Sequence, residues 1–311
     1  MRDLAAVTLF PLLVAAMAAF ALLGSDADVA SALGLAPEAH GGLAALAAVL
    51  LFYPVVALLE RAFPHRADWS RARGDVRTDA THLVLTGPLT SALFDATLRG
   101  AAVGAGAALA ARFGVGLWPG HWPVLAQLAL AVLVAELGHY GFHRLSHEHP
   151  LVWRVHAVHH SAPRLYWLNA TRFHPLDLFA LIACQSVPLL ALGIEARAML
   201  AYTLFAIVYG QLQHANVELR TGWLDRVFST PGLHRFHHST DAREGNQNYG
   251  AILSAWDTAF GTFFRAGGRG FEGPIGLGAL PRFPAGYLGQ LAAPFRWARI
   301  LRENGADRRG A

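Results

Sequence analysis

The chain has 311 residues, of which 54% are hydrophobic and only 15% are charged. A water-soluble domain of this size carries more charge and shorter apolar runs, so the composition predicts an integral membrane protein. All 25 basic residues are arginine, which excludes lysine Schiff bases and a P-loop, and the single cysteine, Cys184, excludes internal disulfides, cysteine-bound zinc and iron–sulfur clusters.

The first apolar run covers residues 4–24 and is long enough to cross a bilayer as a helix. A cleaved signal peptide is the alternative, but a second run at residues 42–59 follows at once, so we expect an uncleaved first span. Arginines follow the second run and are absent from the loop before it, so the positive-inside rule places the N-terminus and residues 61–77 in the cytoplasm. Because the arginines are scattered between apolar runs, we expect no nucleic-acid partner.

Residues 82–110 predict one tilted or interrupted crossing, because Pro88, Asp95 and Arg99 break the apolar run. The number of spans between residues 78 and 121 is left open by the pattern.

The following runs alternate across the bilayer. Residues 122–137 return the chain to the cytoplasm, and residues 178–193 and 198–212 predict a membrane hairpin whose arms are short enough to be re-entrant. Beyond residue 220 the chain is polar, and residues 288–301 predict an amphipathic helix at the interface.

Histidines are the main chemical signal of this sequence. It has 16 of them, and 12 lie between His139 and His238. All but His149 form three boxes at ends of apolar runs and two single positions: His139, His143 and His147; His156, His159 and His160; His174; His214; and His234, His237 and His238.

Helical geometry explains why these spacings suit metal binding. Side chains at i, i+3 and i+4 spread over about 100° of a helix surface, so the three imidazoles of each HxxHH box are expected to point one way. Two triplets and one pair supply more nitrogens than one tetrahedral zinc uses and suit two metal ions with open positions. Neutral imidazole is compatible with iron, zinc, copper or nickel, so the ligand type does not choose the metal.

A surface role or a haem-binding role for the histidines explains less of their spacing than a two-metal site does. Polar helix faces at a membrane surface would more naturally use arginine and glutamate and have no reason to repeat this spacing. A bis-histidine haem leaves most of the boxed residues unexplained. The isolated histidines before residue 139, together with His149, are expected to be bystanders.

Residues 136–264 contain a series of short motifs around the histidines: HRLSH, WRVHAVHHS, RFHPLD, HANVE, LHRFHHS, NQNYG and LSAWDTAFGTF. In these motifs and their order the segment resembles the fatty acid hydroxylase/sterol desaturase superfamily of integral membrane oxygenases. The resemblance implies a helical membrane bundle with a cytosolic cap, a histidine-bound di-iron centre in that cap, and use of O2 with externally supplied electrons.

The resemblance also implies a set of metal ligands. His214 matches a position at which some members place two histidines three residues apart, and Gln211 occupies the partner position here. His174 matches a histidine of the sterol-type branch, and His139 is additional to the minimal first box, so the ligand role of these two is left open. The remaining eight match directly: His143, His147, His156, His159, His160, His234, His237 and His238.

Polar residues near the boxes are candidates for outer hydrogen-bond partners of the ligands. Glu136 lies one turn before His139 on the same helix face, and Asn216, Asp177 and Asp257 are also available. A cap or turn role is an equal alternative for each of them.

The expected function is a membrane-bound non-haem di-iron oxygenase that hydroxylates or desaturates a fatty acyl, sterol-like or related lipid. A zinc-dependent membrane hydrolase using the same histidines is the alternative, and zinc is also possible as a substituted metal. A metal transporter would line a transmembrane path instead. No fused redox centre is apparent, so we expect a separate electron donor, a cytochrome or ferredoxin with its reductase.

These expectations divide the chain into three regions. Residues 1–121 form an N-terminal transmembrane region, residues 122–265 form the histidine-box catalytic region with its membrane hairpin, and residues 266–311 form a cytosolic or interfacial tail. The fold class is all-α, and the active site is expected on the cytoplasmic face of a multi-pass protein.

Overall fold

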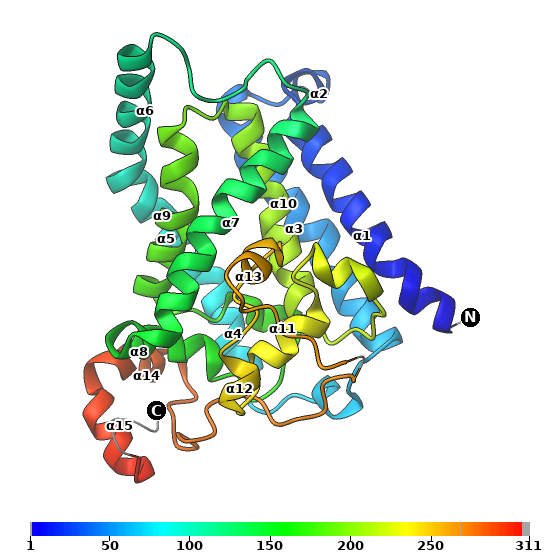
Figure 1. Ribbon diagram of the computed structural model, residues 1–311. Coiled ribbons are helices and arrows are strands. Elements are labelled where there is room, and N and C mark those ends of the chain that lie inside the picture. The colour runs from blue at the N-terminus through cyan, green and yellow to red at the C-terminus, as the bar shows by residue number, and fades with distance from the viewer. Residues whose placement is uncertain (1, 268, 307–311) are drawn as a thin grey trace.

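The computed structural model describes residues 2–267 and 269–306, and these residues form helices and loops without a β-strand. Long helices lie side by side and run vertically in Figure 1, and short helices gather at their lower end. The expected all-α bundle is therefore confirmed. The long helices are α1 (Arg2–Gly24), α3 (Pro37–Ala62), α7 (Val124–Glu148), α9 (Pro175–Ala191) and α10 (Ala196–His214).

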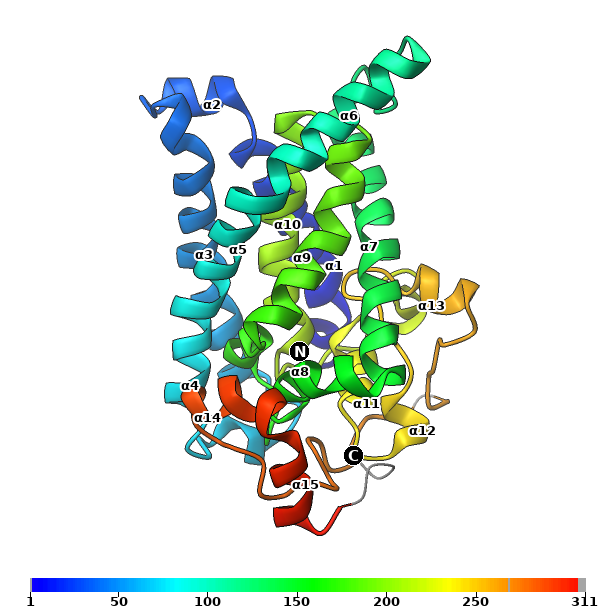
Figure 2. The same cartoon turned by 90° about the vertical axis from the view of Figure 1, so that its left-hand side faces the viewer.

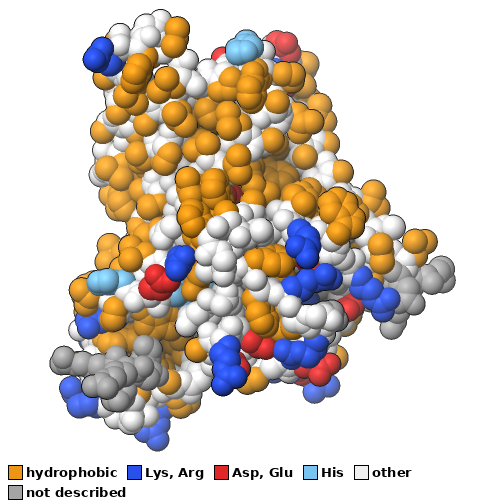
Figure 3. Space-filling model, viewed as in Figure 1, with side chains coloured by type: hydrophobic (Ala, Val, Ile, Leu, Met, Phe, Trp, Pro, Cys, Tyr) orange, Lys and Arg blue, Asp and Glu red, His pale blue; other side chains and the backbone are white. Residues whose placement is uncertain are grey.

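Among the described residues, three helices are long and apolar enough to cross a membrane: α1 over Ala6–Gly24, α3 and α7. Helix α9 is a shorter apolar helix, as expected for one arm of the hairpin. Hydrophobic side chains cover most of the upper part of the face in Figure 3, and most of the arginines and acidic residues visible there gather in the lower part. This distribution is that of a membrane protein with one polar end.

The interrupted segment of the sequence forms one continuous helical run with two wider turns. Its regular parts are α4 (Val76–Thr81), α5 (Gly87–Phe94) and α6 (Gly100–Phe113), and π-helical turns at His82–Thr86 and Asp95–Arg99 join them. In the first turn the Gly87 N–H bonds to the His82 carbonyl. The wider turn comes just before Pro88, whose ring would clash with the carbonyl four residues back in a regular α-helix.

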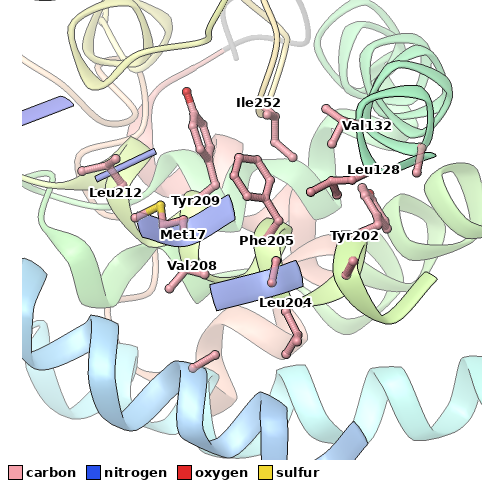
Figure 4. Close-up of a cluster of buried hydrophobic side chains, with 14 of the residues drawn as sticks. Met17, Leu128, Val132, Tyr202, Leu204, Phe205, Val208, Tyr209, Leu212 and Ile252 are labelled. Carbon is pink, nitrogen blue, oxygen red and sulfur yellow. The ribbon is translucent and has the colours of Figure 1, made fainter. Parts of the chain in front are cut away.

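Helix α10 lies at the centre of the bundle. Its buried residues pack against α1, α3 and α7, and the close-up in Figure 4 shows side chains from α1, α7 and α10 meeting there. Phe10 and Met17 of α1 are fully buried in this core, so α1 is part of the packed structure. Besides Met17, Figure 4 labels Leu128, Val132, Tyr202, Leu204, Phe205, Val208, Tyr209, Leu212 and Ile252.

Helices α7 and α9 approach closely at a glycine. A Cβ atom on Gly138 would lie 1.9 Å from the Cys184 carbonyl oxygen, so only glycine fits at this point. One residue further along, the Gln185 amide contacts Nδ1 of His139 at 2.9 Å. The close contact therefore aligns the histidine-bearing end of α7 with α9.

Short helices cap the lower end of the bundle, as Figure 2 shows from a second side, while α2 (Ala27–Ala32) lies at the opposite end. In the tail, Trp297, Ile300 and Leu301 pack with Ala157 of α8, whereas Leu288 and Phe295 are 76% exposed. Residues 288–301 thus have one packed and one exposed side, but they form two short helices joined by a 3-10 turn instead of the single helix expected. The cap helices are α8 (Pro150–His160), α11 (Pro231–His237), α12 (Ala242–Gly245), α13 (Ala255–Ala259), α14 (Tyr287–Ala292) and α15 (Trp297–Asn304), with 3-10 turns at Ala67–Ser70, Trp167–Thr171, Gly222–Arg226 and Ala293–Arg296.

Candidate metal centre

Nine histidines from four helices meet at the junction of bundle and cap. They come from the lower ends of α7 and α10 and from α8 and α11, with His238 directly after α11. They form two groups, and within each group one nitrogen of every ring lies within 4.8 Å of those of the others. The first group is His143, His147, His156, His160 and His237, and the second is His159, His214, His234 and His238.

Each HxxHH box contributes to both groups. In α8, His156 and His160 belong to the five-histidine group, whereas His159 belongs to the four-histidine group. The three rings of this box lie close together, with centroids 5.0 to 5.5 Å apart, but adjacent residues on a helix differ in direction by about 100°, so one box can serve two neighbouring groups. The last box divides in the same way, with His234 and His238 in one group and His237 in the other.

The five-histidine group presents its Nε2 atoms to one point. Nδ1 of His143 donates to the Tyr249 carbonyl at 2.6 Å, and Nδ1 of His237 donates to the Gln247 carbonyl at 2.8 Å. A carbonyl only accepts, so Nδ1 carries the proton and Nε2 keeps a free lone pair. Nδ1 of His156 and of His147 meet the oxygens of Asp177 and Asn246 at 2.9 and 3.2 Å. The Nε2 atoms of all five rings are buried without a partner among the described residues: His143, His147, His156, His160 and His237.

In the four-histidine group, three ring nitrogens crowd together. Nε2 of His234 lies 2.9 Å from that of His214 and 3.0 Å from that of His238. An imidazole nitrogen offers either one N–H or one lone pair, so His234 cannot satisfy both neighbours by hydrogen bonds. Nδ1 of His214 donates to Asn169 Oδ1 at 3.0 Å, which leaves the lone pair of its Nε2 free.

This geometry fits a bound cation in each group. Two ligands at about 2.1 Å from one ion and at right angles to each other lie about 3.0 Å apart, which agrees with the spacing of the three crowded nitrogens. In the five-histidine group the converging Nε2 atoms have no other partner among the described residues. The donors are imidazoles without a carboxylate, a set that suits borderline metals such as iron, zinc and copper.

Burial keeps the site histidines of the cap neutral, as metal ligands must be. It lowers their pKa values well below the ordinary value, because the charged imidazolium loses its hydration inside the protein. This holds for His156, His159, His160, His234, His237 and His238.

Buried ion pairs hold the segment between α8 and α9 in place. Arg164 pairs with Asp75, and Arg172 pairs with Asp79, each at 2.6 Å. This segment carries Asn169, the partner of His214, and the Arg172 carbonyl accepts from Nδ1 of His159 at 3.3 Å. The ion pairs therefore position oxygens that orient rings of the four-histidine group.

Of the carboxylates singled out in the sequence, Asp177 alone meets a grouped histidine in the described structure. Glu136 instead accepts three backbone N–H groups, from Ala251, Ile252 and Leu253, at 2.9 to 3.0 Å. Asp257 binds the N–H groups of residues 249 and 250, and so organises the turn next to His143. The other ring partners are loop carbonyls and two asparagines. Asn246 and the carbonyls of Gln247 and Tyr249 lie in the NQNYG motif, and the Arg172 carbonyl lies in RFHPLD, whereas Asn169 lies in none of the quoted motifs.

Two further candidate ligands, His139 and His174, lie in neither group. Nδ1 of His174 accepts the Leu176 N–H, and its Nε2 meets the Leu291 carbonyl at 3.2 Å, so both nitrogens are already used. His139 receives the Gln185 amide on Nδ1 and lines a cavity beside His143. The structure thus assigns these residues positions around the centre instead of in it.

Replacing Asp177 by asparagine is expected to weaken metal binding by about 10- to 100-fold. Asparagine keeps an oxygen for His156 but removes the negative charge that makes the ring a stronger donor. Competition against a chelator measures the affinity. Asp95→Asn is the matched control, because that carboxylate is exposed and pairs with Arg99; equal affinities in the two variants would contradict the assigned role.

A cavity of about 610 Å³ reaches both groups from within the bundle. His143 and His156 of one group and His159, His214 and His234 of the other line it. Its wall follows α10 from Tyr202 to His214, a rise of about 18 Å at 1.5 Å per residue. Most of the remaining wall is apolar and comes from α3, α5, α9 and α10. An apolar molecule in this cavity would contact both groups of histidines at its end.

Comparison with known proteins gives a consistent result. The sequence model for fatty acid hydroxylase matches residues 128–262. The chain is 40% identical over 242 residues to the ornithine lipid hydroxylase OlsE of Rhizobium tropici, covering 78% of this chain and 72% of that protein. It is 32% identical over 133 residues to the alkylglycerol monooxygenase of Homo sapiens, and this match covers 43% of this chain and 29% of that protein. It is 24% identical over 145 residues to methylsterol monooxygenase 1 of Danio rerio, and this match covers 46% of this chain and 48% of that protein. No solved structure matches the chain.

Proposed function

Because the chain belongs to the fatty acid hydroxylase/sterol desaturase superfamily and is a lipid oxidoreductase, we propose that its nine grouped histidines hold two iron ions that activate O2. The relatives named above are hydroxylases and monooxygenases, which gives the zinc hydrolase alternative no support. We take residues 122–265 as the catalytic region, between a transmembrane region at 1–121 and a tail at 266–311.

The observation that carries this proposal is the pair of buried imidazole groups at the end of an apolar cavity. A redox-active metal pair supplies the oxidising power for an unactivated C–H bond, which acid–base groups lack. The protein's own residues hold the Nε2 atoms in position, exclude water by burial and direct the lipid along α10 toward both groups. Five imidazoles around one ion also exceed the four ligands of a structural zinc site.

Monooxygenation of an ornithine lipid is the reaction we propose to test first. The name of the Rhizobium tropici relative supplies the substrate, and the identity extends over 72% of that protein. All three relatives are named for insertion of oxygen, which favours hydroxylation over desaturation. In that reaction one oxygen atom enters the lipid and the other leaves as water, so a reductant must supply electrons.

We place the histidine centre on the cytoplasmic side. Arginines are concentrated after α3 and in the cap that carries α8 and α11, and Figure 3 shows them at the polar end of the molecule. The arginine-bearing cap suits an acidic electron-transfer protein, such as a ferredoxin or cytochrome with its reductase.

One experiment tests both the reaction and the topology. Inverted membrane vesicles containing the protein, supplied with ornithine lipid, O2 and a ferredoxin–reductase pair, should form hydroxylated lipid with one atom from labelled O2. Right-side-out vesicles should be inactive, because the protein donor cannot cross the bilayer. Oxygen incorporated from water would contradict the oxygenase assignment, and activity confined to right-side-out vesicles would contradict the topology.

A further inference from the structure

Polar side chains in the wall of the cavity differ in whether they already have partners. Gln185 contacts His139, and the Gln213 amide donates to Ser229 and to the Gly250 carbonyl. The Thr203 hydroxyl donates to the Met199 carbonyl of its own helix. The hydrogen-bonding groups named here are already paired within the protein, so a bound molecule does not need to pair with them.

Gln211 differs from these side chains. It lines the cavity, its residue is only 4% exposed, and its side-chain amide interacts with the Tyr53 hydroxyl, whereas its amide oxygen is buried with no hydrogen-bond partner among the described residues. A buried carbonyl without a partner costs free energy, and polar groups inside a membrane bundle commonly mark a substrate site. The unmet acceptor therefore points to a donor on the molecule that fills the cavity.

Gln211 lies near the end of the cavity at which the histidines are found, so a donor bonded to it would also lie there. Gln211 precedes His214 by three residues on α10, so the two side chains lie on neighbouring positions of one helix face. The rise between them is about 4.5 Å. A group bonded to Gln211 would lie within about one helical turn of the four-histidine group.

We propose that Gln211 accepts a hydrogen bond from an N–H or O–H of the lipid substrate, close to the carbon that is oxidised. The inference rests on the proposed function and narrows its substrate class. The substrate carries an amide, amine or hydroxyl near the reacting carbon, and a plain hydrocarbon chain leaves the Gln211 oxygen without a partner. Gln211 is thus a residue that determines specificity and positions the lipid.

Binding of two matched probes tests this directly. A long-chain N-alkyl amide and the ester of the same chain lengths differ only in that the ester replaces the N–H by oxygen. Each competes with a fluorescent acyl lipid for the iron-loaded, full-length protein in detergent without O2. Binding is therefore measured independently of turnover, so failure of the oxygenase assignment is seen separately, in the vesicle assay.

The native protein is expected to bind the amide about tenfold more tightly than the ester, because the ester leaves the buried carbonyl unpaired. Gln211→Met should bind both equally and keep its metal content. Thr203→Val is the matched control, because it removes a wall hydroxyl that already has a partner, and the tenfold preference should remain.

Three results would overturn the proposal. Equal binding of amide and ester by the native protein would mean that water or another group satisfies Gln211, and this comparison stands even where a variant does not fold. If Gln211→Met still bound the amide more tightly than the ester, the N–H of the amide would have a partner other than Gln211. Loss of metal in a folded Gln211→Met protein would make Gln211 a metal ligand instead.

Discussion

Replacing His237 or His238 by alanine is expected to reduce turnover by more than 100-fold, beyond the range of about 10- to 100-fold for outer residues. His237 belongs to the five-histidine group and His238 to the four-histidine group. Each variant should therefore lose mainly one of two bound ions. Metal analysis and iron spectroscopy on the purified proteins measure this loss.

A neighbouring histidine provides the control for this experiment. His149 lies between the first two boxes, is exposed and belongs to neither group. His149→Ala should keep both metal ions and full turnover. Unchanged metal content in folded His237→Ala and His238→Ala proteins would contradict the assignment of both centres.

Removal of the metal is expected to abolish turnover, and only a redox-active ion should restore it. Protein depleted by a chelator should regain activity with ferrous iron under reducing conditions, whereas zinc should occupy the histidines without restoring turnover, because zinc has no accessible redox change. Product formation after each reconstitution is the measurement.

Thermal unfolding separates loss of chemistry from loss of structure. An ion that binds the folded protein raises its melting temperature, so zinc and iron should both stabilise the depleted protein. Turnover with zinc alone, independent of O2 and reductant, would contradict the oxygenase assignment and support the zinc-dependent hydrolase. Failure of zinc to stabilise the protein would show that zinc does not bind, and a second redox-inert divalent ion would then take its place in the comparison.

The two HxxHH boxes illustrate how far local patterns reach. Spacing alone identifies His156 and His160 as neighbours on one helix face, and the structure keeps them together. Spacing alone also groups His159 with them, yet His159 faces His214, which lies 55 residues later in the chain. The direction of a helical side chain follows from local geometry, but its partner depends on which helix packs opposite.

The hydrogen-bond partners of the histidine rings could not be predicted from the sequence either, because they too depend on which segments pack together. Gln247 and Tyr249 lie in the NQNYG motif, but every residue has a backbone carbonyl, so the motif does not show which carbonyls face a ring. For Glu136 the sequence suggested a partner that the structure does not show. Its position one turn before His139 suggested that its carboxylate binds a histidine ring. The loop at residues 251–253 packs against α7 instead, and three backbone N–H groups of this loop donate to the Glu136 carboxylate.

By itself the sequence determined the apolar, helical character of the chain, its family and the set of candidate histidines, because hydropathy, motifs and helical periodicity are local properties. Only the tertiary structure decided the division into two groups, the exclusion of His139 and His174 from both, and the cavity with the unpaired oxygen of Gln211. These features arise from contacts between helices distant in the chain, and such contacts are set by packing of the whole bundle.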